Sequence, residues 1–200
     1  KQINIVAISA KNKNKKRSFK INKKIFNSNP LDIIKKKKIH ILFEVIGLSD
    51  GISKRIVETA IKNKIHVITP NKALIAKHGD YLSRLAEKNN VNLEFEAAVG
   101  GGIPVLRTIK EGLATNKITK VYGILNGTSN YILSEMETTK NSFEDVLKKA
   151  KTLGYAEPGN PKLDLNGYDV LSKVKILSSL SFNNKISNSS YLMEGIENIE

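Results

Sequence analysis

The stretch Ile39-His40-Ile41-Leu42-Phe43-Glu44-Val45-Ile46 decides the fold, because its run of apolar and β-branched residues predicts a buried strand. Apolar residues then recur at helical spacing from Ile52 to Ile61, behind the candidate helix cap Ser49-Asp50. A second apolar run covers Ile65 to Thr69 and is stopped by a proline. Strand, helix and strand in this order predict a parallel α/β sheet.

The alternation of strands and helices continues on both sides of this unit. Before it, Ile3 to Ile8 predicts a strand and Lys11 to Arg17 a loop. After it, a helix is expected over Ala76 to Lys88 and a strand over Val91 to Ala97. The first part of the chain is therefore predicted to be a doubly wound, Rossmann-like nucleotide-binding domain.

A different pattern follows the glycine run Gly100-Gly101-Gly102. Pro104 can open a helix that runs to about Thr115, and Ile118 to Leu125 alternates like a strand. Further helices are expected over Ser129 to Glu137, Ser142 to Leu153 and Tyr168 to Phe182. We therefore predict two domains, a nucleotide-binding domain over residues 1–97 and an α+β domain over residues 98–200.

The composition is that of a globular protein. Its 200 residues suffice for a buried core, with 40% hydrophobic and 26% charged residues. No apolar run reaches membrane-spanning length, so no membrane partner is expected. The chain has no cysteine, which excludes disulfides and thiolate catalysis and suits a cytoplasmic protein. Its three histidines are scattered, which argues against a histidine-rich metal site.

The net charge of +14 introduces the alternative of a basic nucleic-acid-binding module. The basic residues are concentrated in Lys11 to Lys24 and Lys35 to Lys38, without the aromatic interleaving that base stacking needs. A solvated, lysine-rich surface accounts for them better, so no nucleic-acid partner is expected.

The stretch from Ala156 to Lys173 has the chemistry of a binding site. It places three carboxylates and one lysine around the turn signals Pro158-Gly159 and Asn160-Pro161. A site that holds a small zwitterion and moves a proton needs such groups. Asp169 and Lys173 are four residues apart at the start of an apolar-periodic run, so a helix would put both on one face.

Three further motifs accompany this acidic stretch: Pro70-Asn71-Lys72-Ala73-Leu74, Phe95 to Pro104 and Gly123 to Ile132. Together the four resemble homoserine dehydrogenase in order and spacing, over about residues 65 to 182. The resemblance implies an NAD(P)-dependent oxidoreductase acting on a CH–OH group. Its reaction would interconvert homoserine, a small amino-acid substrate, and aspartate 4-semialdehyde in the biosynthesis of threonine, methionine and isoleucine. It also implies a homodimer and makes residues 98–200 the catalytic and dimerisation domain.

The resemblance gives three kinds of role to the acidic stretch. Lys173 matches the proton shuttle, and a lysine can serve in this way when burial or positive neighbours lower its pKa. Glu157 and Asp169 match the carboxylates that receive the substrate's ammonium group, and Asp164 is expected to help them. The alternative interpretation is a surface pair of Lys173 and Asp169, with the carboxylates as helix caps or loop residues. The turn Pro158-Gly159-Asn160-Pro161 is one residue longer than usual, so its geometry is expected to differ.

Three residues are expected to contact the cofactor, two of them because of the resemblance and Gly47 because of its position. The resemblance places Lys72 near the nicotinamide and the substrate, and Gly154 against the cofactor. Gly47 follows a predicted strand, where a glycine lets the backbone approach a dinucleotide. A helix-start lysine, a helix C-cap and a simple turn are the alternatives. Basic residues between Lys11 and Arg17 stand where cofactor selectivity is usually set, which favours NADP over NAD.

A structural sodium ion is the remaining implied ligand. The resemblance places it at Glu96 and the backbone carbonyls of Val99, Gly101 and Ile103, and hard cations prefer such oxygen ligands. A hinge between the domains is the alternative use of the glycine run, and the two are compatible.

Two further expectations concern the chain as a whole. It is expected to be incomplete at both ends, lacking the first strand with its G-x-G-x-x-G turn and a C-terminal part. The rival function is that of another Rossmann-type oxidoreductase, acting on a different amino acid or semialdehyde.

Overall fold

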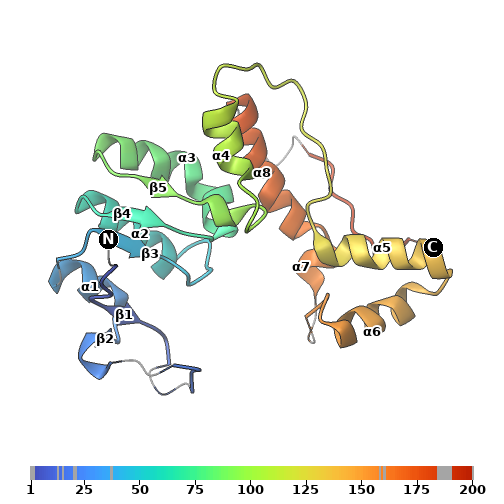
Figure 1. Cartoon of the computed structure of the whole chain (residues 1–200), viewed down its shortest axis with the longest axis horizontal. Coiled ribbons are helices and arrows are strands. Elements are labelled where there is room, and N and C mark those ends of the chain that lie inside the picture. The colour runs from blue at the N-terminus through green and yellow to red at the C-terminus, as the bar shows by residue number, and fades with distance from the viewer. Residues whose placement is uncertain are drawn as a thin grey trace. The chain divides into compact units, whose positions relative to one another are not determined.

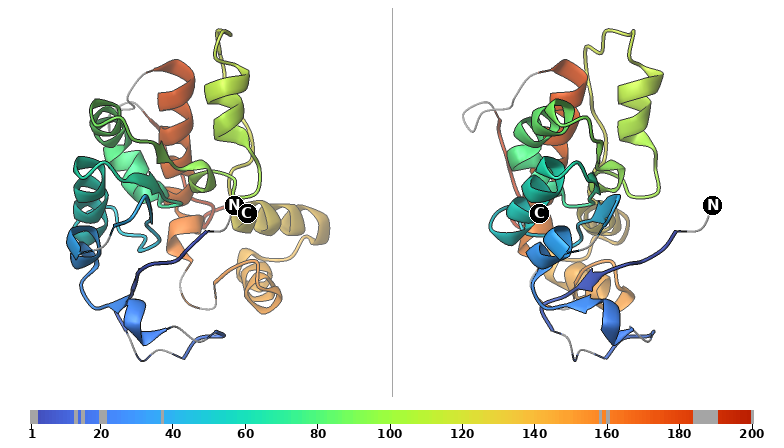
Figure 2. Two further views of the ribbon diagram at one scale, coloured as in Figure 1. Left: turned by 60° about the vertical axis from the view of Figure 1, so that its left-hand side comes forward. Right: turned by 90° about the vertical axis from the view of Figure 1, so that its left-hand side faces the viewer.

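The computed structural model describes residues 3–12, 14, 16–19, 22–36, 38–157, 159, 161–183 and 191–199. The chain divides into two compact units, Lys1–Ala98 and Val99–Glu200. Figures 1 and 2 show the order of helices and strands within each unit. No helix in the described part of the chain is both long enough and apolar enough to cross a membrane.

The first unit is built on a parallel sheet of three strands. The strands β3 (Ile41–Phe43), β4 (His66–Ile68) and β5 (Leu93–Glu94) lie in that order. Helices α2 (Ile52–Lys62) and α3 (Lys72–Lys88) connect them (Figure 1). The predicted α/β architecture with parallel strands is therefore confirmed.

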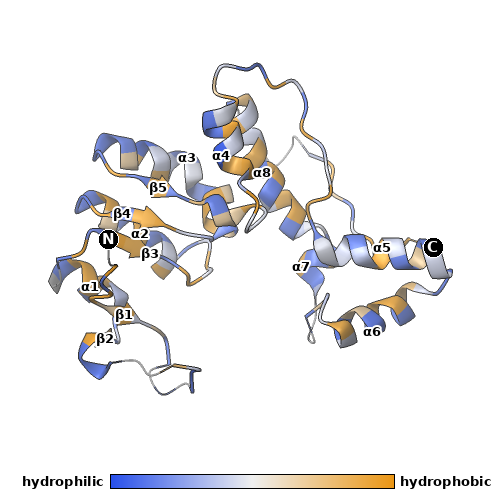
Figure 3. Ribbon diagram, in the orientation of Figure 1, coloured by the Kyte–Doolittle hydropathy of each residue, from blue (hydrophilic) through white to orange (hydrophobic). Residues whose placement is uncertain are grey.

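The core of this unit lies between the sheet and its two helices. Apolar and polar residues are interleaved along the helices in Figure 3, as in helices that bury only one side. Each side chain buried completely contributes about 1.5–3 kcal/mol by leaving water. The largest fully buried apolar side chains here are Val57, Ile61, Val67, Leu74 and Leu82.

The prediction of a buried strand at Ile39 to Ile46 is correct for one face of the sheet. Leu42 is buried, whereas its neighbours Ile41 and Phe43 are 48% and 57% exposed. Successive side chains of a strand point to opposite faces. The strands lie in sequence order, and connections between parallel strands are right-handed, so α2 and α3 cover the same face of the sheet. The buried Leu42 therefore faces these helices, and its neighbours point to the other face.

The amino-terminal strand is much shorter than predicted. Instead of Ile3 to Ile8, only β1 (Ile8–Ser9) forms, paired in parallel with β2 (Phe26–Asn27). The 3-10 helix η1 (Lys23–Ile25) and the helix α1 (Pro30–Lys36) flank β2. Ile3 and Ile5 are exposed, so these two apolar side chains do not belong to the core of this unit.

The predicted cap of α2 is wrong. The N-cap residue is Gly51 at φ 62°, without a side-chain hydrogen bond. The Asp50 carboxylate instead accepts from Lys77 Nζ at 2.7 Å and lies 2.9 Å from His78 Nε2. Hydrogen bonds from Lys77, Ser49 and His78 hold the pKa of Asp50 well below its usual range. The carboxylate therefore bonds to Lys77 and His78 of α3 and to Ser49 instead of the helix end.

Helix α3 begins at Lys72, four residues before the predicted start at Ala76. Asn71 provides the missing signal, because its Oδ1 accepts from the backbone N–H of Leu74 at 3.1 Å. Beyond α3, the strand expected over Val91 to Ala97 is reduced to β5, followed by the 3-10 helix η2 (Glu96–Ala98).

The second unit is helical in its described residues. Helix α4 (Val105–Arg107) continues into the π-helical turn η3 (Thr108–Gly112). Together they form the helix predicted after Pro104, which ends at Gly112 rather than at about Thr115. The other predicted helices are confirmed as α5 (Gly127–Thr139), α6 (Phe143–Leu153) and α8 (Tyr168–Phe182). The short helix α7 (Lys162–Leu165) was not predicted.

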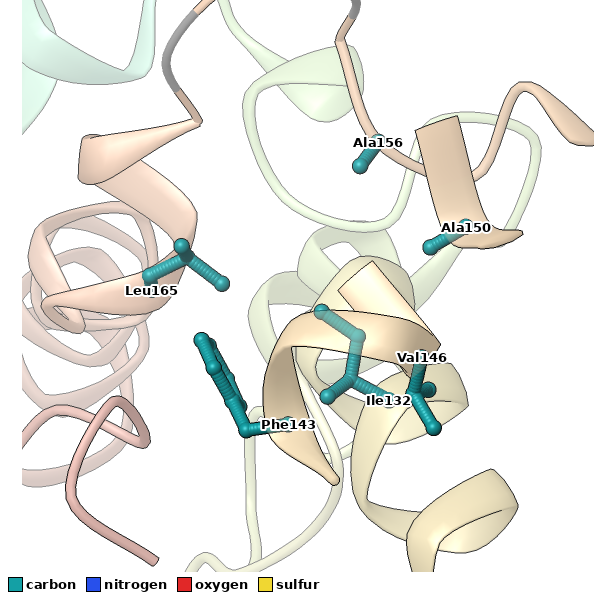
Figure 4. Packing of buried hydrophobic residues seen from close by; sticks show 6 residues of the cluster. All are labelled: Ile132, Phe143, Val146, Ala150, Ala156 and Leu165. Atoms are coloured by element: carbon teal, nitrogen blue, oxygen red, sulfur yellow. The ribbon is translucent and has the colours of Figure 1, made fainter. Parts of the chain in front are cut away.

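The hydrophobic core of this unit joins α5, α6 and α7. In Figure 4, Ile132 of α5 points toward Phe143 and Val146 of α6, and Leu165 of α7 approaches from the other side. Ala150 and Ala156 complete the cluster. The packing fixes α7, and thereby the start of α8, against α5.

The strand predicted over Ile118 to Leu125 is wrong. The segment is irregular, and its residues Tyr122 and Ile124 are 86% and 76% exposed. A strand needs a partner for its backbone groups. The described part of this unit contains no strand, so the alternation here finds no sheet to join.

Replacing Leu82 with alanine tests the core of the first unit. The variant should lose about 2–5 kcal/mol of unfolding free energy, because a cavity is left beside the sheet. Native-state hydrogen exchange of the β4 and α3 amides measures the loss locally. Leu48→Ala is the matched control, since Leu48 is 53% exposed and should change little. Equal losses in the two variants would contradict this assignment of the core.

Candidate functional site

Helix α8 brings together the two residues that the sequence spacing pairs. Gly167, in the left-handed region at φ 81°, precedes the helix, and Asp169 lies in its first turn. Lys173 Nζ is 2.8 Å from Asp169 Oδ2, and the two side chains are only 17% and 6% exposed. The expected i,i+4 pair therefore forms, but largely buried rather than on the surface.

Asn126 connects this pair to the rest of the unit. Its Nδ2 donates to Asp169 Oδ2 and to Asp164 Oδ1, at 2.9 Å in each case. Its Oδ1 accepts from the backbone N–H of Ser129 at 2.8 Å and so caps α5. The amide therefore holds two carboxylates and a helix terminus at once.

The backbone next to Asn126 holds Lys173. Lys173 Nζ donates to the Leu125 carbonyl as well as to Asp169. An ammonium group has three N–H donors. Among the described residues two of these donors are directed at protein acceptors, which leaves one for a further oxygen atom.

Asp164 reaches the same cluster from helix α7. Ser129 Oγ donates to the Asp164 carbonyl at 3.1 Å, which ties α7 to the start of α5. The side chain of Asp164 is half-buried and directed at Asn126. Two carboxylates thus meet at Asn126, and the Lys173 ammonium group pairs with one of them. Two formal negative charges and one positive charge leave a net negative charge, which suits a cationic ligand group.

The loop between α6 and α7 contains the other expected residues. Gly154 ends α6 in the left-handed region at φ 80°, so it does serve as a helix C-cap. Tyr155 stacks on Tyr131 with ring centroids 4.2 Å apart, and its carbonyl accepts from Thr128 Oγ1 at 2.7 Å. Glu157 is exposed beyond this anchored stretch. Pro158 and Asn160, in the lengthened turn, lie outside the described residues.

The cofactor candidates of the first unit lie at the ends of neighbouring strands. Gly47, at φ 88°, follows β3, and Lys72 follows β4 as the first residue of α3. A side-chain Cβ added at Gly47 would meet no atom within 4 Å, so the backbone there is open to a ligand. The carboxyl ends of parallel strands are where α/β proteins bind ligands.

The sodium candidates lie in a sharply turned segment. Glu96 begins η2, and Val99 is buried just after it. The glycines Gly100 and Gly102 adopt φ values of 61° and 90°. The backbone N–H of Ile103 donates to the Gly100 carbonyl at 2.8 Å, which closes the turn.

Asn126 is the site residue that the sequence prediction missed. In the sequence it stands out only as part of the motif Gly123 to Ile132, and in the structure it also caps α5. The sequence feature that could have identified Asn126 is its position between the apolar run Ile118 to Leu125 and the helix that follows. An amide at such a junction can cap with its oxygen and still donate with its nitrogen.

Family models match nearly all of the chain. The homoserine dehydrogenase model covers residues 104–200, and the model of the homoserine dehydrogenase NAD binding domain covers residues 1–96. The chain belongs to the homoserine dehydrogenase family. This confirms the resemblance and, with it, an NAD-binding domain followed by a second domain of that family.

Individual members of the family agree with the models. The homoserine dehydrogenase of Neisseria gonorrhoeae is 43% identical over 175 residues, which are 88% of this chain and 40% of that protein. The crystal structure of a homoserine dehydrogenase from Thiobacillus denitrificans superposes with a TM-score of 0.81 at 41% identity, covering 87% of this chain and 40% of that one. A hyperthermophilic archaeal homoserine dehydrogenase in complex with NADPH gives 0.79 at 27% identity, over 88% and 53%. The chain thus spans about two fifths to one half of its relatives.

Replacing Asn126 with leucine tests how the carboxylate cluster is held. We expect a loss of about 1–3 kcal/mol of unfolding free energy, because Asp164 and Asp169 lose a donor and α5 loses its cap. Urea unfolding followed by circular dichroism measures this loss. Asn130→Leu is the control, since Asn130 lies exposed on the same helix. A loss for Asn126→Leu no larger than for the control would contradict the role.

Proposed function

We propose that the chain catalyses the NADP-dependent interconversion of L-homoserine and L-aspartate 4-semialdehyde, the activity of its family. The observation that carries the proposal is the buried Lys173–Asp169 pair, with a lysine N–H left for a substrate oxygen. Oxidation of a hydroxyl to an aldehyde releases one hydride and one proton. A bound nicotinamide dinucleotide supplies the hydride acceptor.

Lys173 is the proposed proton shuttle. In the direction of reduction it donates its remaining N–H proton to the aldehyde oxygen, and in the direction of oxidation the neutral amine takes the proton back. Asp169 and the Leu125 carbonyl keep Nζ in one place throughout. Little of the side chain is exposed, so bulk water competes weakly for the same position.

The carboxylates of the site are proposed to bind the substrate's ammonium group. Asp169 and Asp164 already share Asn126, and Glu157 would join them from the loop after Gly154. The ammonium group of homoserine suits an acidic partner, and the proton of its reacting hydroxyl group needs an acceptor such as a lysine amine. The cluster supplies both types of group within one unit.

The cofactor is proposed to lie at the carboxyl ends of β3 and β4, with Gly47 and Lys72 among its contacts, and Gly154 as a further contact. We favour NADP because Lys11, Lys16 and Arg17 follow β1, where a 2′-phosphate would be neutralised. The NADPH held by the archaeal family member supports this choice.

Three further features belong to the same proposal. A structural sodium ion would be held by Glu96 and the carbonyls of Val99, Gly101 and Ile103, an all-oxygen set that suits a hard cation. A homodimer would cover the exposed apolar side chains of the segment Ile118 to Leu125. The absence of cysteine suits an enzyme of the cytoplasm.

Lys173→Ala tests the shuttle. Homoserine-dependent reduction of NADP, followed as absorbance of NADPH, should fall roughly 10²–10⁴-fold, because the proton transfer loses its positioned base. The dissociation constant of NADPH should stay as in the parent chain. Lys148→Ala, an exposed lysine of α6, is the control. Near-normal turnover in Lys173→Ala would rule out the role, and activity on a related amino acid but not homoserine would favour the rival oxidoreductase.

Glu157→Gln tests substrate binding apart from folding, since Glu157 is exposed. We expect the KM for homoserine to rise about tenfold, with the KM for NADP unchanged, because one partner of the ammonium group loses its charge. Glu144→Gln, on the exposed first turn of α6, is the control. Unchanged kinetics for homoserine would remove Glu157 from the site.

A further inference from the structure

We propose that Glu44 is a positioning residue for the cofactor site, which sets the Gly47 loop and the start of α3 in one fixed arrangement. The inference rests on the proposed function only in taking Gly47 and Lys72 as cofactor contacts. Glu44 directly follows β3 and is 2% exposed. A buried carboxylate is costly unless its oxygen atoms are hydrogen-bonded.

Both oxygen atoms of Glu44 are used, and they reach two different segments. Oε1 accepts from the backbone N–H groups of Ile46 and Gly47, at 2.9 and 3.4 Å. Oε2 accepts from Thr69 Oγ1 at 2.7 Å and from Asn71 Nδ2 at 3.2 Å. One side chain therefore binds the loop after β3 to the loop after β4.

Asn71 extends this link to Lys72. Its Nδ2 also donates to the Leu48 carbonyl at 2.9 Å, and its Oδ1 caps α3 through the N–H of Leu74. Its backbone N–H donates to Thr69 Oγ1 at 3.0 Å. Because Lys72 is the next residue along the chain, its place is fixed by the bonds that Asn71 makes with the Gly47 loop.

The geometry also explains why a carboxylate serves here rather than an apolar side chain. An apolar residue would avoid the cost of burying a carboxylate, but the N–H groups of Ile46 and Gly47 and the Thr69 hydroxyl would lose this acceptor. Asn71 Nδ2 would keep only the Leu48 carbonyl. The N–H groups of Ile46 and Gly47 point inward to Glu44, so their direction is set before a ligand arrives. Such preorganisation increases affinity by reducing the ordering that binding requires.

The test is Glu44→Gln in the full chain, with NADPH as the probe. Glutamine keeps the size but replaces one acceptor with a donor, so one pair of N–H or O–H groups loses its partner. We expect the dissociation constant of NADPH, measured by its fluorescence, to rise at least about tenfold. In turnover, the KM for NADP should rise while the KM for homoserine changes little. If Glu44 had only a structural role, the KM for NADP and the KM for homoserine would both rise or both stay unchanged.

Two further variants keep the test decisive. Glu94→Gln, an exposed glutamate at the end of β5, is the matched control and should leave NADPH binding unchanged. Thr69→Val removes one donor of the network and should weaken NADPH binding in the same direction. A variant with both Glu44→Gln and Thr69→Val should bind NADPH no more weakly than Glu44→Gln alone, because both changes act on one network. If Glu44→Gln does not fold, Thr69→Val carries the test.

The outcomes separate this inference from the proposed function. Folded Glu44→Gln and Thr69→Val variants that bind NADPH like the parent chain would overturn the positioning role. A parent chain that binds NADPH but does not oxidise homoserine would contradict the proposed reaction, while the binding measurements would still decide the role of Glu44.

Discussion

The Oδ2 atom of Asp169 receives hydrogen bonds from both Lys173 and Asn126, and the candidate site depends on this shared acceptor. Helix α8 supplies the acid and the lysine, one turn apart. Asn126 brings in Asp164 of α7 and the start of α5. The hydrophobic contacts of Ile132, Phe143 and Leu165 hold α5, α6 and α7 together. The polar hydrogen bonds and the apolar packing therefore hold the residues of the candidate site in one arrangement.

The first unit uses the same physical device in a different place. Glu44 is a buried acid that joins two loops at the carboxyl ends of β3 and β4. In both units a buried carboxylate accepts hydrogen bonds from a segment distant in sequence, so that moving that segment would leave a buried acceptor with fewer partners. Unpaired buried groups cost about 1–3 kcal/mol each. Of the residues proposed to meet cofactor and substrate, Gly47 donates to Glu44, Lys72 follows the Glu44 partner Asn71, and Lys173 bonds to Asp169.

Sequence periodicity was sufficient for the elements that bury one face. The helices α2, α6 and α8 were predicted because apolar residues mark the side that meets the core. The pair Asp169–Lys173 followed from helix geometry alone. Periodicity failed where a partner was needed: Ile118 to Leu125 alternates but finds no strand among the described residues, and Asp50 bonds to α3 instead of capping α2. Asn126 and Glu44 act through contacts between residues distant in sequence, which a linear pattern does not contain.

The central claim is that Lys173 meets the reacting oxygen of homoserine. A crystal structure of the full chain with homoserine and NADP bound tests it most directly. The account predicts the homoserine hydroxyl oxygen at a hydrogen-bond distance from Lys173 Nζ, about 2.6–3.2 Å, with the ammonium group of homoserine against Asp169 and Glu157. A hydroxyl group held by other residues, with Lys173 still bound only to Asp169 and Leu125, would contradict it.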